Sequence, residues 1–250
     1  MKEYTTEFIR NIALVSHSSA GKTMLAEAFL HFTGATTRLG KIEDGSSVSD
    51  FEEEEIRRGI SLSTGVVPIE FNDHKLNILD TPGYTDFVGE MVSALRVSDG
   101  AVVLVDSVAG AEVGTEIAWN YCDQFNIPRF VLINKMDRDN ADFQKALASV
   151  QRLSEVRLLP VQLPWGEKQD FQGVIDLLSM KAYSGTGTTA AEIPSDLLED
   201  AEAAQNELIE AAAEGEDELL MKYLEGEALD AAEIMRGLVA VFRSGSYIPV

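Results

Sequence analysis

The sequence predicts an α/β fold with a doubly wound, mostly parallel sheet, and two observations support this class. Short, continuous apolar runs recur at 9–15, 101–105 and 129–133, as is typical of parallel strands covered on both faces. Segments with apolar residues at helical spacing separate these runs. Strands that alternate with helices in this way form a sheet that binds ligands at the carboxyl ends of its strands.

The first half of the chain contains the expected elements in order. Strand 9–15 leads through a glycine-bearing loop into a helix that ends near Phe32. Residues 33–57 are polar with little periodicity and predict a long functional loop with a short helix at 50–55. The acidic run Glu52 to Glu55 in this loop is expected to face water. A strand pair follows, at 62–71 and 75–79.

The character of the chain changes near Leu153. Before it, a helix lies on each side of strand 129–133, at 117–125 and 143–150. After it, the patterns predict strands at 157–163 and 171–175, a connector at 185–189, and helices at 197–212 and 234–242. We therefore expect a P-loop core formed by 1–152 plus 245–250, and an acidic mixed α/β insertion at 153–244.

Composition restricts the class of protein. The chain has 250 residues, 45% of them hydrophobic, and no apolar run approaches the roughly 20 residues of a membrane span. The first ten residues lack an apolar signal core, and the single cysteine, Cys122, cannot form an internal disulfide. These features favour the cytoplasm. A net charge of −22 argues against direct nucleic-acid binding by this chain alone.

The negative charge is concentrated in the second half. Between Ala190 and Arg236 there are fifteen acidic residues and two basic ones. Such a segment forms either a solvated helical face or a docking surface for a basic partner, and the sequence leaves both open.

Residues Ser16 to Thr23 (Ser-His-Ser-Ser-Ala-Gly-Lys-Thr) have the context of a phosphate-binding loop between a strand and a helix. Backbone N–H groups and the helix N-terminus favour a polyphosphate there. Lys22 is expected to reach the β- and γ-phosphates, and Thr23 to give its hydroxyl to Mg2+. Ser16 replaces the usual first glycine, so a Gly-Lys-Thr that merely begins a helix is the alternative. The predicted nucleotide contacts are Ser18, Ser19, Ala20, Gly21, Lys22 and Thr23.

Asp80-Thr81-Pro82-Gly83 ends the strand at 75–79. The carboxylate of Asp80 can hold Mg2+, directly or through water, and the N–H of Gly83 can contact the γ-phosphate and sense hydrolysis. A plain Pro-Gly turn is the alternative.

Asn134-Lys135-Met136-Asp137 follows strand 129–133. Asp137 can accept hydrogen bonds from N1–H and the exocyclic amine of guanine, which adenine cannot supply, so a site of this kind rejects adenine. Asn134 is expected to tie this loop to the phosphate loop, and the stem of Lys135 to cover the base. An ordinary polar loop is the alternative, but the three motifs occur together, in order, each at the end of an apolar strand.

These motifs resemble the GTP-binding domain of a translational GTPase of the elongation factor G type. The likeness covers essentially the whole chain and extends to further stretches, Arg58-Gly59-Ile60-Ser61, Gly173 to Leu177, Met180 to Tyr183 and Tyr223 to Gly226. The resemblance implies GTP or GDP with Mg2+ as cofactors and Ser61 as a further metal ligand. It also implies switches at 34–61 and 81–97, the ribosome as partner, and a ribosomal stalk protein at the insertion.

Four departures from the family pattern stand out. Tyr84 replaces the usual catalytic histidine, and because a phenol has a longer reach, hydrolysis is expected to be weakened or re-routed. Ser61 replaces a threonine but keeps the hydroxyl. Ser19 replaces an aspartate and removes a negative charge beside the phosphates. The chain stops at Val250, before the family's last base-contacting loop, so a fragment of a longer multidomain protein with a weakened base site is expected.

The resulting hypothesis is a GTPase, intrinsically slow and stimulated by the ribosome during elongation, with Tyr84, Lys22 and Gly83 as catalytic residues. The rival is a GTP-gated binding module with little or no hydrolysis, which Tyr84 keeps open. A third reading, an ATP-using P-loop enzyme, is disfavoured by Asn134 and Asp137.

Overall fold

The computed structural model describes residues 2–185 and 189–250, which form two compact units, Met1–Asn134 and Lys135–Val250. Most of the connector predicted at 185–189 lies outside the described residues. The predicted division into a core of 1–152 plus 245–250 and an insertion of 153–244 stays a prediction. No helix within the described ranges combines the length and apolar character that crossing a membrane requires.

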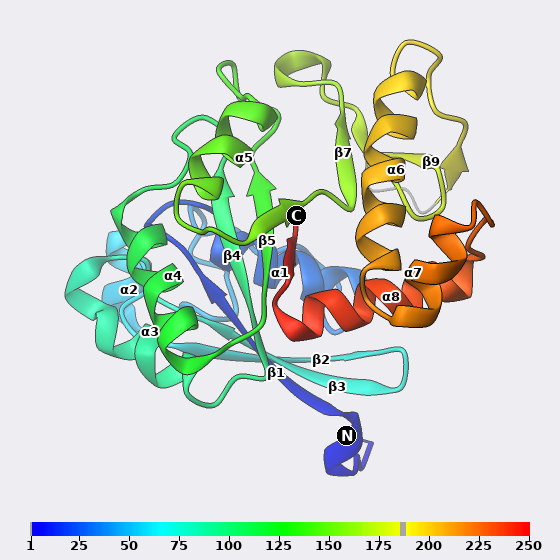
Figure 1. The fold of residues 1–250 in the computed structure, drawn as a ribbon. Coiled ribbons are helices and arrows are strands. Elements are labelled where there is room, and N and C mark those ends of the chain that lie inside the picture. The colour runs from blue at the N-terminus through cyan, green and yellow to red at the C-terminus, as the bar shows by residue number, and fades with distance from the viewer. Residues whose placement is uncertain (1, 186–188) are drawn as a thin grey trace. The chain divides into compact units, whose positions relative to one another are not determined.

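The first unit is built on a five-stranded sheet in the order β2-β3-β1-β4-β5 (Figure 1). Strand β2 is antiparallel to β3, and the other neighbours are parallel. This arrangement confirms the predicted fold class. The strands are β1 (Ile9–Val15), β2 (Gly65–Phe71), β3 (His74–Asp80), β4 (Gly100–Asp106) and β5 (Arg129–Asn134). The helices are α1 (Lys22–Phe32), α2 (Glu53–Arg58), α3 (Val88–Leu95) and α4 (Val113–Phe125), with short 3-10 turns at Thr6–Phe8 and Thr85–Phe87.

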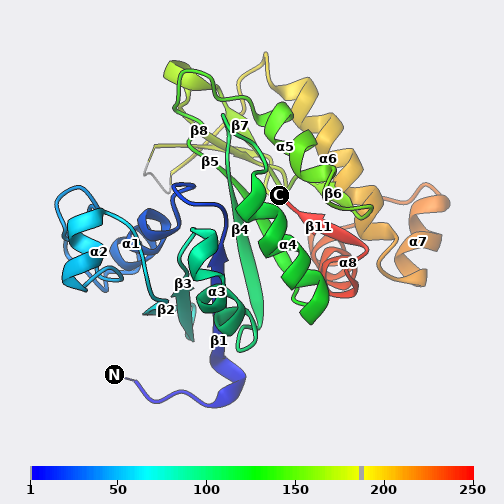
Figure 2. The same cartoon turned by 90° about the vertical axis from the view of Figure 1, so that its left-hand side faces the viewer.

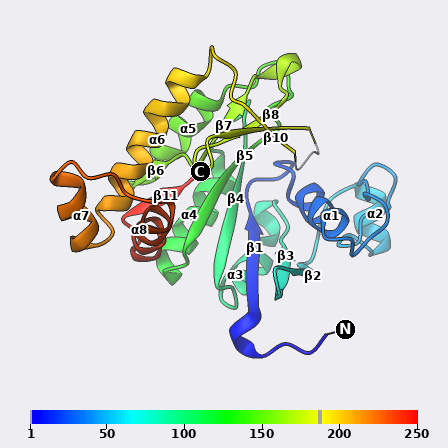
Figure 3. The same ribbon diagram turned by 90° about the vertical axis from the view of Figure 1, so that its right-hand side faces the viewer.

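Alternate residues of the strands line opposite faces of this sheet. Leu14, Ile78 and Leu104 pack with Ala26 and Leu30 of α1 in one buried cluster. Helices α3 and α4, which contact β1 and β4, lie in front of the strands in Figure 2, whereas Figure 3 faces the side of α1. A sheet covered on both faces explains why its strands are continuous apolar runs.

Three predictions for the loop after α1 need correction. The strand expected from residue 62 begins at Gly65, because the carboxylate of Glu55 accepts the backbone N–H groups of Leu62 and Ser63 at 2.9 and 3.1 Å, which keeps them out of the sheet. Glu55 is therefore buried, 2% exposed, although the acidic run was expected to face water. The short helix is also displaced toward Arg58, where Gly59 ends it with φ 64°.

The second unit combines a four-stranded sheet, β10-β9-β8-β7, with a parallel pair, β11-β6. The strand expected at 157–163 is wrong: it is two strands in different sheets, separated at Pro160, whose nitrogen has no hydrogen to donate. The strands are β6 (Arg157–Leu159), β7 (Gln162–Trp165), β8 (Gly173–Asp176), β9 (Lys181–Ser184), β10 (Ala190–Ala191) and β11 (Tyr247–Pro249). The helices are α5 (Phe143–Gln151), α6 (Leu198–Ala213), α7 (Asp217–Leu224), α8 (Ala231–Ser244) and a 3-10 turn, Lys168–Asp170.

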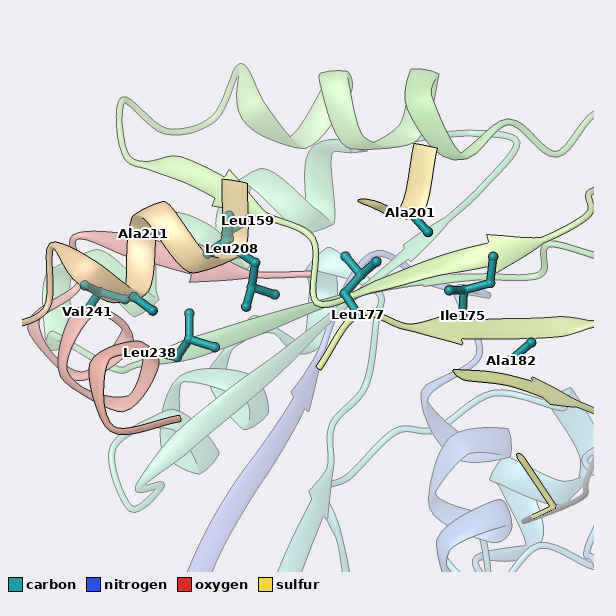
Figure 4. Close-up of a cluster of buried hydrophobic side chains, with 10 residues drawn as sticks. Leu159, Ile175, Leu177, Ala182, Ala201, Leu208, Ala211, Leu238 and Val241 are labelled. Atoms are coloured by element: carbon teal, nitrogen blue, oxygen red, sulfur yellow. The ribbon is translucent and has the colours of Figure 1, made fainter. Parts of the chain in front are cut away.

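The core of the second unit lies where α6 and α8 meet the strands (Figure 4). Leu177, Leu208 and Leu238 are almost fully buried there. The two helices cross closely, because a Cβ added to Gly237 would lie 2.1 Å from the carbonyl oxygen of Ala212. Helix α6 therefore has an apolar buried side and an acidic exposed side, as an amphipathic helix requires.

Candidate functional site

The carboxyl ends of the parallel strands carry those residues of the three predicted motifs that belong to the first unit. Strand β1 ends at Val15, directly before the phosphate-binding loop, and β3 ends at Asp80, whose partner in β1 is Leu14. Strand β5 ends at Asn134, which pairs with Asp106 of β4. Because parallel strands end at the same edge, these segments lie at one edge of the sheet.

The loop 16–21 has the backbone of a phosphate cradle. Ser19 and Gly21 adopt left-handed conformations with φ 63° and 106°, and Gly21 caps α1. The side-chain amide of Asn134 donates 2.9 Å to the carbonyl of Ala20, and a Cβ on Gly21 would lie 2.4 Å from that amide nitrogen. A glycine is therefore required for Asn134 to hold the loop.

Lys22 is folded into this loop. Its ammonium group donates to the hydroxyl of Ser16 at 2.9 Å and to the carbonyl of His17 at 3.1 Å. The side chain is buried, and burial lowers the pKa of Lys22 to about 8 although Asp80 and Asp50 act to raise it. A buried ammonium group of this kind is suited to binding an anion, because the negative charge of a polyphosphate stabilises the protonated form that burial disfavours.

Asp80 is the centre of a group of hydroxyls. Its Oδ2 accepts hydrogen bonds from Thr23 at 2.7 Å and from Ser49 at 2.8 Å, and the hydroxyls of Thr23 and Ser61 lie 3.3 Å apart. Within the described part of the chain, Oδ1 of Asp80 is buried and has no hydrogen-bond partner. The three predicted metal ligands, Thr23, Ser61 and Asp80, are thus brought together.

The charge of this group is not balanced by protein alone. Burial raises the pKa of Asp80 to about 6, against the lowering effect of the Thr23 and Ser49 hydrogen bonds. Burial also raises the pKa of Asp50, which a hydrogen bond from Ser61 lowers in part. Two buried carboxyl groups with raised pKa values and an orphaned oxygen fit a divalent cation, for which oxygen ligands are preferred.

Gly83 packs directly against the phosphate-binding loop. A Cβ at this position would lie 2.5 Å from Nζ of Lys22 and 2.7 Å from Cα of Ser18. The turn is tied down by Thr81, whose buried hydroxyl donates 2.7 Å to the carbonyl of Leu14. The N–H of residue 83 is therefore carried close to the loop that would hold the phosphates.

Two further groups surround the loop. Tyr84 is 43% exposed and lines a small hollow together with Ser16, Gly83 and Gly114. His17 makes local contacts: its Nδ1 accepts the N–H of Gly114 at 3.2 Å, and its Nε2 lies 3.6 Å from Glu112. His17 thus shapes the loop through these neighbours.

Lys135 and Asp137 begin the second unit. Lys135 has φ 63°, the left-handed turn that ends the strand, and Asp137 is exposed. Between them Met136 is buried and its carbonyl accepts the N–H of Lys168 at 2.8 Å. A buried methionine flanked by polar residues fixes the conformation of this loop.

Sequence reasoning missed several residues of the site. Ser49 and Asp50 lie in the long polar loop and are 5% and 4% exposed. Glu27 is 1% exposed on α1, at the helical spacing of i+4 from Thr23, and that spacing was the available signal. Thr81 was named only as part of its motif.

The family of the chain follows from a match over almost its whole length. The model of the family described as the elongation factor Tu GTP binding domain matches residues 7–241. The chain belongs to this family. The predicted resemblance to the G domain of a translational GTPase is therefore confirmed.

A solved structure agrees with this assignment to the elongation factor Tu GTP-binding domain family. The crystal structure of a protein from Thermus thermophilus is 37% identical, with a TM-score of 0.90. The match covers 97% of this chain and 37% of the Thermus chain, so the chain spans little more than a third of that protein's length.

Proposed function

We propose that the chain binds GTP and GDP with Mg2+ and hydrolyses GTP to GDP and phosphate. The observation that carries the proposal is the group formed by Thr23, Ser61 and Asp80 beside the buried ammonium of Lys22. Membership of a GTP-binding domain family supports guanine nucleotide binding in general. The residue roles and the reaction are the proposal.

The metal would be held by the hydroxyls of Thr23 and Ser61, with Asp80 taking part directly or through water. Two observations support this assignment: Oδ1 of Asp80 has no hydrogen-bond partner among the described residues, and burial raises the pKa of that carboxyl group. When bound, Mg2+ would neutralise charge on the β- and γ-phosphates.

The nucleotide itself would be held by two segments. Backbone N–H groups of 18–23 would face the phosphates, and Lys22 would contact the β- and γ-phosphates. Asp137 would select guanine by accepting hydrogen bonds from the N1–H and the exocyclic amine of the base, which Lys135 would cover. Asn134 would hold the phosphate-binding loop through its hydrogen bond to Ala20.

Hydrolysis would proceed by in-line attack of water on the γ-phosphate, with Gly83 N–H contacting that phosphate. Catalysis in this class is mainly positioning and charge stabilisation, and unassisted relatives turn over at about 10⁻⁴ to 10⁻² per second. Tyr84, which lines a hollow with Ser16 and Gly83, would orient the water through its hydroxyl. A slow intrinsic rate implies a stimulating partner, and we propose the ribosome.

A second candidate function keeps the same nucleotide site. In a GTP-gated binding module, GTP orders the segments 34–61 and 81–97 so that they grip a partner, and turnover is incidental. Tyr84, which stands where a histidine is usual, favours this candidate. Both candidates require GTP binding and differ in hydrolysis.

The acidic face of α6 to α8 is proposed to contact a ribosomal stalk protein. Most acidic residues of α6, including Glu199, Glu202 and Glu207, are exposed and project from a helix anchored by its buried apolar side. If deletion of these helices leaves stalk binding unchanged, this part of the proposal is wrong.

The test is GTP hydrolysis by the intact protein, with and without purified ribosomes. Stimulation by orders of magnitude is expected for the GTPase, whereas GTP binding without stimulation would favour the binding module. Lys22→Ala should lower the affinity for GTP at least about tenfold, because a charged hydrogen bond to phosphate is lost. Lys145→Ala, an exposed lysine of α5, is the matched control and should change nothing.

A further inference from the structure

Ser49 contacts the proposed metal site, although its loop is poor in sequence signals. The side chain is 5% exposed, and its hydroxyl donates 2.8 Å to Oδ2 of Asp80, the oxygen that also accepts from Thr23 at 2.7 Å. With two hydroxyls on one oxygen, the carboxylate is fixed in one orientation. Its other oxygen, which has no partner among the described residues, then remains available to a cation or its water.

The sheet leaves space for Ser49 at Gly65. This glycine begins β2 and pairs with Asp80 across the antiparallel register. A Cβ added to Gly65 would lie 2.7 Å from Cβ and 3.1 Å from Cα of Ser49. Any side chain at residue 65 would therefore push Ser49 away from Asp80.

Glu27 holds the loop from the opposite side. Its carboxylate is 1% exposed and accepts the N–H of Gly40 at 3.1 Å and that of Val48 at 2.5 Å, the residue directly before Ser49. A Cβ on Gly40 would lie 2.3 Å from this carboxylate, so a glycine is needed where the loop packs against Glu27. Thr23 and Glu27, one turn apart on α1, thus face the site and its loop together.

We propose that Ser49 is a positioning residue of the Mg2+ site, and that Glu27 and Gly65 hold it there. The proposal rests on the proposed binding of nucleotide with Mg2+. Ser49 orients Asp80 through Oδ2, and Glu27 fixes the loop that carries Ser49. The effect on the cation is exerted through Asp80, and outer groups of this kind are worth about 10- to 100-fold in metal affinity.

The first test is the Mg2+ dependence of nucleotide retention. Dissociation of a fluorescent mant-GDP is measured over a range of Mg2+ concentrations, and the Mg2+ concentration for half-maximal retention is compared between variants. Ser49→Ala is expected to raise it about tenfold, with thermal unfolding of the nucleotide-free protein unchanged within a few degrees. Gly65→Ala is expected to act in the same direction. Ser47→Ala, which removes a hydroxyl from the same loop, is the matched control and should match the wild type.

The second test follows the anchor without nucleotide. Hydrogen exchange of the Gly40 and Val48 amides should be slow in the wild type and at least about tenfold faster in Glu27→Gln, because an amide nitrogen cannot accept the second N–H. Glu43→Gln removes an equal charge from an exposed residue of the same loop and should leave both amides protected. Glu27→Gln should also raise the Mg2+ concentration for half-maximal retention of mant-GDP.

These readouts separate the two proposals. A wild-type protein that retains no mant-GDP at any Mg2+ concentration contradicts the proposed function, and the assignment of Ser49 to a metal site falls with it, whereas hydrogen exchange still tests the Glu27 anchor. If nucleotide binds but Ser49→Ala stays within twofold of the wild type, the role of Ser49 is overturned. Unprotected amides at Gly40 and Val48 overturn the anchor.

Discussion

The side-chain amide of Asn134 donates a hydrogen bond of 2.9 Å to the backbone carbonyl of Ala20, which lies 114 residues earlier in the chain. This contact joins the end of β5 to the phosphate-binding loop. It passes so close to Gly21 that a side chain there would strike the amide. The hydrogen bond therefore holds the end of β5 against the loop that is proposed to bind phosphate.

Asn134→Ala should lower the affinity for mant-GDP about tenfold, since a buried carbonyl loses its donor and the loop loses its brace. Fluorescence titration measures this. Asn77→Ala is the matched control, because its amide also bridges two strands of the same sheet, donating to Asn11 at 2.8 Å, without contacting the phosphate-binding loop. Equal affinities for wild type and Asn134→Ala would show that the hydrogen bond from Asn134 to Ala20 does not support nucleotide binding.

Gly83→Ala should reduce the ratio of GTP to GDP affinity and slow hydrolysis, each by about tenfold or more. The added methyl would meet the backbone of Ser18 at 2.7 Å, so the turn must move away from the phosphate-binding loop. Gly89→Ala tests whether any alanine in this segment has such an effect, because a Cβ there meets nothing within 4 Å. The two variants should therefore differ sharply in a GTP and GDP titration.

Asp80→Asn should stabilise the nucleotide-free protein at pH 7.5. Burial raises the pKa of Asp80 from 3.8 to about 6. A raised carboxyl pKa contributes stability that is full below about pH 4 and is lost as the pH rises through about 6. A shift of this size corresponds to about 3 kcal/mol, and losing the attraction between Asp80 and Lys22 offsets part of it, so a gain of about 1–3 kcal/mol is expected.

The pH dependence distinguishes this cause from a packing effect. Urea unfolding at several pH values should show the difference between wild type and Asp80→Asn shrinking below pH 6 and disappearing near pH 4. A difference that is constant with pH would mean that the buried charge is not its source. The same variant should need far more Mg2+ to retain GDP.

Tyr84→Phe removes only the phenolic hydroxyl. If that hydroxyl orients the attacking water, ribosome-stimulated hydrolysis should fall about tenfold or more, while GTP affinity stays unchanged. Single-turnover hydrolysis separates chemistry from binding. Unchanged stimulated turnover would show that Tyr84 is not the water-positioning group.

Gly237→Ala should destabilise the second unit by about 1–3 kcal/mol, because the methyl would meet the carbonyl oxygen of Ala212 at 2.1 Å and separate α6 from α8. Thermal unfolding of the whole protein measures the change. Val239→Ala, at a 54% exposed position of the same helix, should change its stability far less. Equal effects of the two variants would contradict the close helix crossing.

The sequence allowed the sheet and the ends of its strands to be predicted. Buried parallel strands are continuous apolar runs, so Val15, Asp80 and Asn134 could be placed at strand ends from the pattern alone. Helical spacing of apolar residues likewise predicted a helix at 117–125, which is the second part of α4, where Trp119 and Cys122 are almost fully buried.

The long loop after α1 could not be predicted in the same way. Its conformation depends on the carboxylates of Glu27 and Glu55, which are buried and accept backbone N–H groups of distant residues. An acidic residue in a polar segment ordinarily indicates a solvated surface, so the burial of Glu55, Ser49 and Asp50 has no local signal, and only the helical spacing from Thr23 indicates Glu27. The break at Pro160 was missed because two apolar strands of different sheets are adjacent in the sequence.

Specificity for guanine nucleotides with Mg2+ is the property on which the proposed function most depends. Its most direct test is displacement of mant-GDP from the wild-type protein by unlabelled GTP and by ATP, in the presence and absence of Mg2+. GTP should displace the probe at stoichiometric to micromolar concentrations, ATP should fail to displace it at millimolar concentration, and removal of Mg2+ should weaken retention of the probe. Displacement by ATP as effective as that by GTP would contradict the assignment.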